Sequence, residues 1–204
     1  YEPLGVVPGK PYDPDAVAAI DGAKFRQAAE SVWKEEMAKV GVPEWDQKYM
    51  RAMFQPKGRI SQEVLLYQSV LGPIGLPASE AVYPPIATAD GEPMNAMHDY
   101  VIRMTPDEMP PAGAFWSVTL YDTENGFFIP NDHKKYSVGE NAGMELDDDG
   151  GISIYIAAEQ PPGVPDENWL PINREDVEIG PILRIYEPDL EQFKTWTIPK
   201  AEKL

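Results

Sequence analysis

The apolar positions of the chain follow two different periods. Between Asp21 and Val40, apolar residues recur at steps of three or four residues or their multiples, which is typical of one face of an α-helix. After Pro77, apolar and polar residues alternate in short runs instead, and this period of two predicts β-strands. We therefore expect an α+β protein in which helices precede the strands.

Two helices and a further helical piece are predicted before Pro77. An Asp13 cap with Pro14 at the first helical position indicates a helix start. The amphipathic helix over 21–40 then carries an apolar stripe and ends at Gly41 and Pro43; the stripe consists of Phe25, Ala28, Ala29, Val32 and Val40, widened by Trp33 and Met37. A second helix begins at a Ser61 cap and ends at Gly72 and Pro73, and residues 45–55 form a third helical piece.

Six short β-rich runs follow, separated by turn clusters such as Asn125-Gly126 and Asp149-Gly150-Gly151. The runs are Asp99–Met104, Phe115–Tyr121, Phe127–Ile129, Ile152–Ala157, Ile182–Tyr186 and a short one near Thr195–Ile198. Strands at this spacing without intervening helices favour an antiparallel β-sandwich of jelly-roll type. The predicted organisation is an extended lead-in or linker (1–12), a helical segment (13–77) and the β-sandwich domain (78–204).

Several motifs occur together in a characteristic order. They are Ala81-Val82-Tyr83-Pro84, Phe115 to Asp122, Tyr136-Ser137-Val138-Gly139, Asn168-Trp169-Leu170-Pro171, Leu183 to Pro188, and Trp196 with Pro199. In this order they resemble the domain-of-unknown-function 1214 family over nearly the whole chain. One departure is the charged stretch over 173–178, where a shorter, proline-rich bridge is expected.

The resemblance implies a jelly-roll-like β domain that often follows a second module, the domain-of-unknown-function 1254. Since the chain begins at Tyr1 without an initiator Met, we expect it to be the C-terminal portion of such a protein. Many relatives of this kind are bacterial and exported, which implies a periplasmic or extracellular location, with the cytoplasm as the alternative. The resemblance brings no established activity.

The predicted strands have two unlike faces because side chains alternate along a strand. Trp116, Val118 and Leu120 point one way, as do the isoleucines of the Ile152 run, and these suit a core. The other side carries rings, hydroxyls and guanidinium groups, which stack on sugars and hydrogen-bond to them. The candidate ligand-binding residues on this face are Arg103, Ser117, Thr119, Tyr121, Tyr155, Arg184 and Tyr186.

Two other interpretations of this face stay open. It is either the solvated outside of a sandwich, where Thr and Tyr are natural strand residues, or a surface on which the helices or a missing module pack. Asp132 and His133 form a weak candidate metal or acid–base pair, and no other metal ligands are expected. The acidic run over 145–150 lacks the closing Glu of an EF-hand.

The composition narrows the classes of partner. Lys and Arg number 17 against 34 Asp and Glu, so the formal net charge is −17. Such a charge disfavours nucleic acid and anionic membranes as partners and leaves neutral small molecules or glycans open. The chain has no cysteine, no apolar run long enough to insert in a membrane and no common nucleotide, serine-hydrolase or zinc-protease motif. We therefore expect no cofactor.

Three functional hypotheses remain. The first is a binding or assembly domain that recognises carbohydrate or an envelope component through the Tyr/Ser/Thr/Arg face. The second is a glycan-active hydrolase or lyase with a Tyr, an Arg and a carboxylate such as Asp122 in its site. The third is a purely structural module that assembles with a preceding N-terminal module or as a homo-oligomer.

Overall fold

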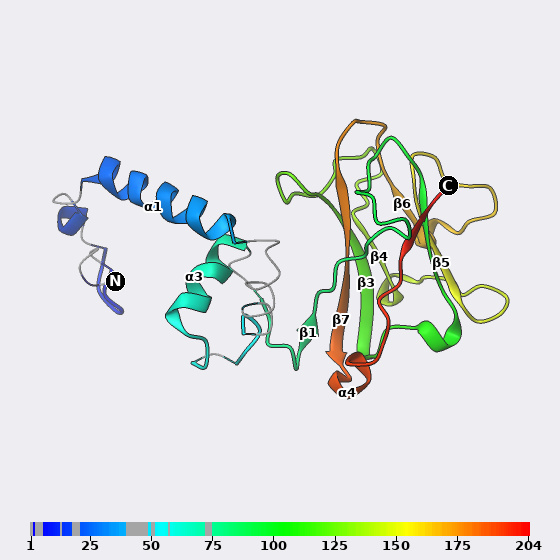
Figure 1. Cartoon of the computed structure of the whole chain (residues 1–204), viewed down its shortest axis with the longest axis horizontal. Helices are drawn as coiled ribbons and strands as arrows, with labels where there is room; N and C mark the ends of the chain where they lie inside the picture. The colour runs from blue at the N-terminus through cyan, green and yellow to red at the C-terminus, as the bar shows by residue number, and fades with distance from the viewer. Residues whose placement is uncertain are drawn as a thin grey trace. The chain divides into compact units, whose positions relative to one another are not determined.

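The structure, a computed structural model, describes residues 2, 6–12, 14–17, 21–39, 49, 52–56, 58–71 and 75–204. The chain divides into two compact units, Tyr1–Gly75 and Leu76–Leu204. We call them the helical unit and the β unit (Figure 1).

The described residues of the helical unit include the α-helices α1 (Gly22–Met37) and α3 (Gln62–Leu71). Asp21 caps α1, because its carboxylate accepts hydrogen bonds from the backbone N–H groups of Ala23 and Lys24. Ser61 caps α3 by accepting from the N–H of Val64 at 3.2 Å. Both predicted helices are therefore confirmed over the described residues.

The remaining predictions for this unit are tested only in part. The Asp13 cap and the predicted helix ends at Gly41, Pro43, Gly72 and Pro73 lie outside the described residues. The 3₁₀ turn η2 spans Pro14–Val17. Of the predicted piece over 45–55, the structure describes residue 49, which is helical, and residues 52–55, which form a turn and a bend.

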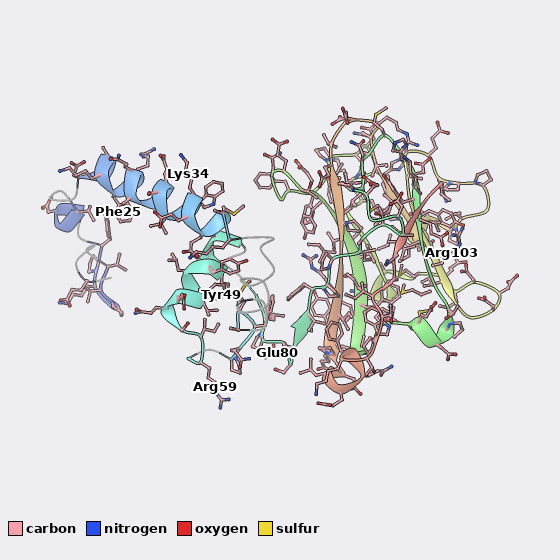
Figure 2. All side chains as sticks on the ribbon, in the orientation of Figure 1. Phe25, Lys34, Tyr49, Arg59, Glu80 and Arg103 are labelled. Atoms are coloured by element: carbon pink, nitrogen blue, oxygen red, sulfur yellow. The ribbon has the colours of Figure 1, made fainter. Side chains whose placement is uncertain are left out.

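The apolar stripe of α1 is not buried. Phe25 is 63% exposed and Trp33 51% exposed, and Phe25 is visible on α1 in Figure 2. The small core of the helical unit is built instead around Tyr49 and Tyr67, whose rings stack at a centroid distance of 4.8 Å. The exposed members of the stripe are Phe25, Ala28, Ala29, Val32 and Trp33; Met37 is half-buried, and Val40 lies outside the described residues.

The β unit consists of two four-stranded sheets. The first sheet has the strand order β1 (Ala81–Val82), β7 (Ile179–Pro188), β3 (Ala112–Asp122) and β4 (Ser137–Gly139), and all its pairs are antiparallel. The second sheet has the order β6 (Trp169–Pro171), β5 (Ile152–Ala157), β2 (Tyr100–Met104) and β8 (Ala201–Lys203). A short helix, α4 (Leu190–Phe193), follows β7.

One hydrophobic cluster contains residues from both sheets. Trp116, Val118 and Leu120 of β3 contribute to it from the first sheet, and Ile154 and Ile156 of β5 from the second, all at most 2% exposed. The predicted aliphatic faces are therefore confirmed as the core side. The opposite face of each sheet points away from this shared core.

Four of the six predicted strand runs are strands, and two predictions were wrong. Residues 127–129 form only an isolated bridge between Phe128 and Tyr121, because the turn after Asp122 and the following Pro130 leave no room for a ladder. Residues 195–198 form a turn and an irregular segment after α4, in which the backbone N–H of Trp196 bonds to the carbonyl of Gln192. Four strands of only two or three residues, β1, β4, β6 and β8, were not predicted.

The coarser prediction of an α+β protein with paired β-sheets is confirmed. The finer prediction of a jelly roll is not confirmed by this strand order. Strand β6 pairs with β5 in a parallel arrangement, with Tyr155 opposite Trp169. A parallel edge pair cannot arise from a simple antiparallel hairpin, and the second sheet is accordingly mixed.

A candidate binding pocket on the first sheet

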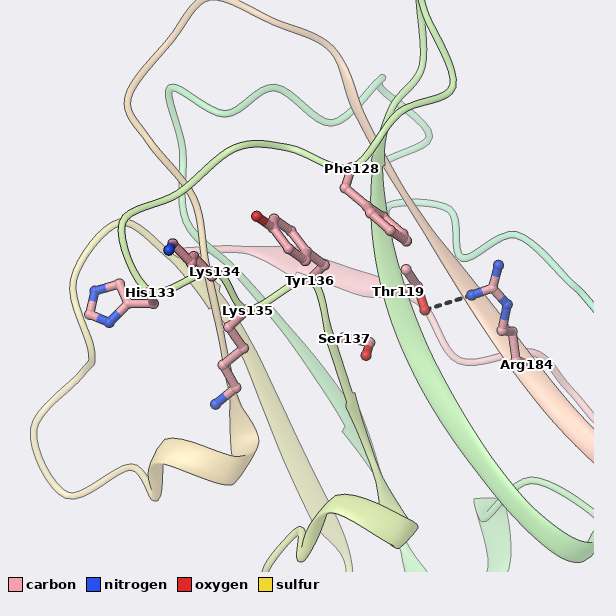
Figure 3. Close-up of a pocket in the computed structure, with 8 residues that line it drawn as sticks. All are labelled: Thr119, Phe128, His133, Lys134, Lys135, Tyr136, Ser137 and Arg184. Carbon is pink, nitrogen blue, oxygen red and sulfur yellow. Dashed lines mark hydrogen bonds between the residues drawn. The ribbon is translucent and has the colours of Figure 1, made fainter.

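A pocket of about 540 Å³ lies on the outer face of the first sheet. Thr119 belongs to this face because its neighbours Val118 and Leu120 point into the core. The strand register places Ser137 of β4 directly opposite Thr119. The eight residues that line the pocket (Figure 3) are Thr119, Phe128, His133, Lys134, Lys135, Tyr136, Ser137 and Arg184.

Arg184 of β7 is held by neutral groups. Its Nη1 donates to Thr119 Oγ1 at 2.8 Å, and its Nη2 donates to the Tyr121 hydroxyl. The guanidinium carbon also lies 5.5 Å from the centroid of the Tyr121 ring and 6.0 Å from that of Tyr83. Two hydroxyls and two rings therefore fix the guanidinium orientation.

Stacked aromatic rings form one wall of the pocket. Phe128 stacks with Tyr121 at a centroid distance of 5.4 Å and with Tyr136 at 5.1 Å. Phe128 is nevertheless 50% exposed. Phe128 and Tyr136 thus give the pocket an apolar surface next to the hydroxyls of Thr119 and Ser137, and the Tyr121 ring supports Phe128 from outside the lining.

The loop that carries the pocket lysines is fastened by Asn131, which is buried. The Asn131 side-chain amide donates to the carbonyls of Ile129 and Lys135, at 3.2 and 2.9 Å. Its Oδ1 accepts from the backbone N–H of Lys135 at 3.2 Å. Within this loop Lys134 adopts a left-handed backbone conformation, with φ of 51°. The surrounding hydrogen bonds hold Lys134 in that conformation.

The pocket lining carries basic groups and no carboxylate. Lys135 is paired with Asp166, which does not line the pocket. The Lys135 ammonium donates to the backbone carbonyl of Asp166 and to the Asp166 Oδ2. His133 packs edge-on against Trp169, with a centroid distance of 4.7 Å. Within the part of the chain that the structure describes, Lys134 and Arg184 form no ion pair.

The predicted ligand-binding residues fall into two groups, and the first lies on β3 and β7. Thr119 and Arg184 line the pocket. Tyr121 supports it from behind through its ring and hydroxyl. Ser117 lies opposite Arg184 on the same face. Tyr186 lies further along β7, where it stacks on Phe115 at 4.4 Å.

The second group lies on the other sheet, so the single shared face that the sequence indicates does not form. Tyr155 of β5 and Arg103 of β2 belong to the second sheet, and Figure 2 shows Arg103 on that side of the β unit. Arg103 pairs with Glu202 at 2.6 Å. The two-sheet arrangement separates these residues from Arg184, because the shared core lies between the outer faces.

The carboxylates that the sequence offered for catalysis or metal binding, Asp122 and Asp132, do not form such a site in the structure. The Asp122 carboxylate accepts from the backbone N–H groups of Glu124 and Asn125 and from the Asn125 side chain. The Asn125 side-chain hydrogen bond lowers the pKa of Asp122 below its ordinary value. Asp132 is exposed. Among the described residues, no group of three or more His, Cys, Asp and Glu side chains could hold a metal ion.

Several pocket residues were not predicted from the sequence. Phe128, Lys134, Lys135, Tyr136 and Ser137 lie in or next to a loop whose local pattern predicts no site. The adjacent Lys134-Lys135 pair in a chain of net charge −17 is the one signal that could have indicated them. Their role depends on the pairing of β4 with β3, which the sequence did not predict.

Fold and site together define an α+β protein with two sheets around one core and an open basic pocket on one sheet. The chain belongs to the family described as "Protein of unknown function (DUF1214)", whose profile matches residues 80–190. The predicted family is thereby confirmed. The association with the domain-of-unknown-function 1254 module stays a prediction.

Solved structures that resemble the chain include those of two longer proteins. The VPA0106 protein from Vibrio parahaemolyticus has 25% sequence identity and a TM-score of 0.63 over 100% of this chain, which corresponds to 49% of that protein's chain. An uncharacterized protein from Burkholderia cenocepacia has 18% identity and a TM-score of 0.44, over 67% of this chain and 33% of the other. This chain thus spans at most about half of either relative. No curated protein matches the sequence. Among the described residues, no helix combines the length and apolar character needed to cross a membrane.

Proposed function

We propose that the β unit is a binding domain that recognises carbohydrate in the pocket on the first sheet. The observation that carries this proposal is the combination, within one open pocket of about 540 Å³, of an aromatic wall and fixed polar groups. Small-molecule sites commonly measure about 300–1,000 Å³ and place a few oriented polar groups against apolar walls. A sugar has the same two kinds of surface, since apolar C–H faces lie between hydroxyls.

The polar groups are arranged for such a ligand. The hydroxyls of Thr119 and Ser137 come from paired positions on β3 and β4, so they face the pocket from neighbouring strands. Arg184 supplies further N–H donors, and its orientation is already determined by Thr119 and Tyr121. A preorganised site loses little side-chain entropy when the ligand binds.

Binding is better supported than glycan hydrolysis. A glycosidase generally uses two carboxyl groups beside the scissile bond, and the residues that line this pocket include none. Asp122, the carboxylate predicted for an enzymatic site, is engaged in the turn with Asn125, and its lowered pKa keeps it ionised at neutral pH. An ionised carboxylate cannot act as the general acid.

The aromatic wall provides the direct test. We expect Phe128→Ala to weaken the binding of a recognised oligosaccharide about fivefold, because an aromatic contact contributes roughly 1 kcal/mol. Phe127→Ala is the matched control: it removes the same side chain from the next position, which is 73% exposed and outside the pocket. Affinities are measured by isothermal titration calorimetry against a panel of neutral and acidic oligosaccharides.

Two outcomes would count against the proposal. One is that no oligosaccharide in the panel binds the intact chain at millimolar concentration. The other is that Phe127→Ala and Phe128→Ala weaken binding equally, which would place the ligand away from the pocket. Unfolding curves of both variants show whether either change acts through stability.

A second candidate function is assembly, and the exposed stripe of α1 favours it. Phe25, Val32 and Trp33 are 63%, 36% and 51% exposed, and exposed apolar patches commonly mark protein–protein contacts. We expect the chain to self-associate through α1 and Trp33→Glu to abolish that association. Light scattering of the wild-type chain decides the question: a monomer at all concentrations would remove this candidate.

Three further statements are proposals that the resemblance supports. They are a jelly-roll relationship of the β unit, a periplasmic or extracellular location, and a preceding module in the full-length protein. An exported location is compatible with the carbohydrate proposal, because envelope and extracellular polysaccharides are found there. Fractionation of cells that express the full-length protein tests the location.

A further inference from the structure

Arg184 is a fixed, partly buried cation that has no anionic partner in the part of the chain that the structure describes. It forms no ion pair among the described residues, and its known hydrogen bonds go to the neutral hydroxyls of Thr119 and Tyr121. A guanidinium has five N–H donors, and these two bonds leave further N–H groups available. Cations that are withdrawn from water are normally paired with an anion. The missing partner is what a ligand can supply.

Lys134 provides a second cation at the same pocket. It also lacks an ion pair among the described residues, whereas its neighbour Lys135 is paired with Asp166. The Lys134 backbone has φ of 51°, and its N–H bonds to the carbonyl of Asn131 at 3.1 Å. An unusual backbone conformation held by its surroundings at a pocket is typical of a functional position.

The positive pocket contrasts with the charge of the chain. The formal net charge is −17, yet no Asp or Glu lines the pocket. Averaged over the surface, the chain repels anions, so the pocket is a local exception. Salt screens charges that lie more than about a Debye length away, roughly 8–10 Å. The potential inside the pocket is therefore set mainly by the basic side chains that line it.

We infer that the pocket selects acidic sugars, and that Arg184 and Lys134 recognise their anionic groups while the aromatic wall and hydroxyls contact the ring. This inference rests on the proposed carbohydrate-binding function and names the substrate class. Guanidinium groups bind carboxylates and sulfates through paired hydrogen bonds. A neutral sugar leaves both cations unpaired.

The position of the two cations favours an acidic oligosaccharide over a single sugar. Arg184 lies on β7, and Lys134 precedes β4, on the other side of β3 in the strand order. Figure 3 shows Lys134 and Arg184 at opposite ends of the pocket, with Phe128 and Tyr136 between them. A chain that carries an anionic group on successive units can reach both ends and cover the rings between them.

The experiment compares a charged probe with its uncharged counterpart. Trigalacturonate and its fully methyl-esterified form have the same rings and hydroxyls, and they differ in that each charged carboxylate of the acid is a neutral methyl ester in the other. We expect the intact chain to bind trigalacturonate at least about tenfold more tightly than the ester at low salt. The preference should shrink when sodium chloride is raised from about 50 to about 500 mM, because salt screens the charge interaction.

Two variants assign the preference to the pocket. We expect Lys134→Ala to weaken trigalacturonate binding about fivefold and to leave ester binding unchanged. Lys200→Ala is the matched control, since Lys200 is exposed and outside the pocket lining and the variant loses the same charge. It should leave the affinity for both probes unchanged. Inorganic sulfate serves as a third probe, without a sugar ring.

The possible results distinguish a failure of the acidic-sugar inference from a failure of the proposed carbohydrate-binding function. Equal affinity for the acid and its ester overturns the acidic-sugar inference and leaves the carbohydrate proposal standing. Sulfate that binds as tightly as trigalacturonate and competes with it also overturns the inference, because the ring would then contribute nothing. If neither the probes nor any oligosaccharide of the panel binds, the proposed function itself fails.

Discussion

The guanidinium of Arg184 donates a hydrogen bond of 2.8 Å to the hydroxyl of Thr119, which is 3% exposed, across 65 residues of sequence. The pairing of β7 with β3 creates this contact, since Ser117 lies opposite Arg184 and Thr119 is two residues further along β3 on the same outer face. The bond fixes the cation at one end of the pocket. The geometry of the candidate site therefore depends on one strand register.

Thr119→Val tests that dependence. The valine has a similar shape and no acceptor, so Arg184 loses one of the two hydroxyls that orient it. We expect a loss of about 1 kcal/mol in the free energy of unfolding and weaker binding of trigalacturonate. Thr197→Val, at an exposed position outside the pocket, should change neither quantity. Unchanged affinity in Thr119→Val would show that the hydrogen bond does not position the cation.

Asn131→Asp tests the loop that carries Lys134. The aspartate cannot donate to the carbonyls of Ile129 and Lys135 and places a negative charge against both oxygens. We expect the free energy of unfolding to fall by about 2–3 kcal/mol, as measured by urea denaturation. Asn141→Asp, at an exposed position, should cost much less. Equal effects of the two changes would contradict the role of Asn131.

Gly139→Ala tests the close approach of β4 to β3. A Cβ atom at Gly139 would lie 2.8 Å from the Cβ of Ser117 and 3.0 Å from the carbonyl oxygen of Trp116. Because the strand itself has to shift, we expect a loss of about 1–3 kcal/mol in unfolding free energy together with a disturbed pocket. Gly180→Ala is a milder control, since its nearest neighbour is the side-chain methyl of Thr123 at 2.9 Å. The order of the two melting temperatures checks this prediction.

Asn125→Ala tests the ionisation of Asp122. In the native chain the Asn125 side chain lowers the pKa of Asp122 below the ordinary value of 3.8. A lowered pKa in the folded state stabilises the fold above the ordinary pKa, and this contribution is lost as the pH falls through the folded-state value. We expect the variant to raise the pKa of Asp122 toward 3.8 and to flatten the loss of stability in acid. An NMR titration of the carboxyl group would refute the assignment if its pKa did not move.

Local patterns sufficed for the class of fold and for the core. The alternation around Trp116, Val118 and Leu120 predicted which side chains are buried, because a strand with one apolar face has only one way to bury it. The cap at Ser61 was likewise predicted, since its capping hydrogen bond joins residues only three positions apart. The cap at Asp21 was not predicted. The family could be recognised from motifs that lie in sequence order.

The site depended on contacts that no local pattern contains. The outward side chains of β2, β3, β5 and β7 look alike in sequence, but the strand order assigns Arg103 and Tyr155 to one sheet and Thr119 and Arg184 to the other. The short strand β4 brings Lys134 and Tyr136 to the pocket, although three residues are too few to give a periodic signal.

The sequence alone therefore determined the α+β class, the start of α3, the buried faces of the main strands and the family. The tertiary structure alone decided which polar groups share a pocket and that this pocket is basic in an acidic chain. The physical reason is the distance along the sequence over which each property is decided. Burial and capping follow from neighbours a few residues apart. The sign of the charge at a pocket follows from side chains that strand pairing brings together from distant segments.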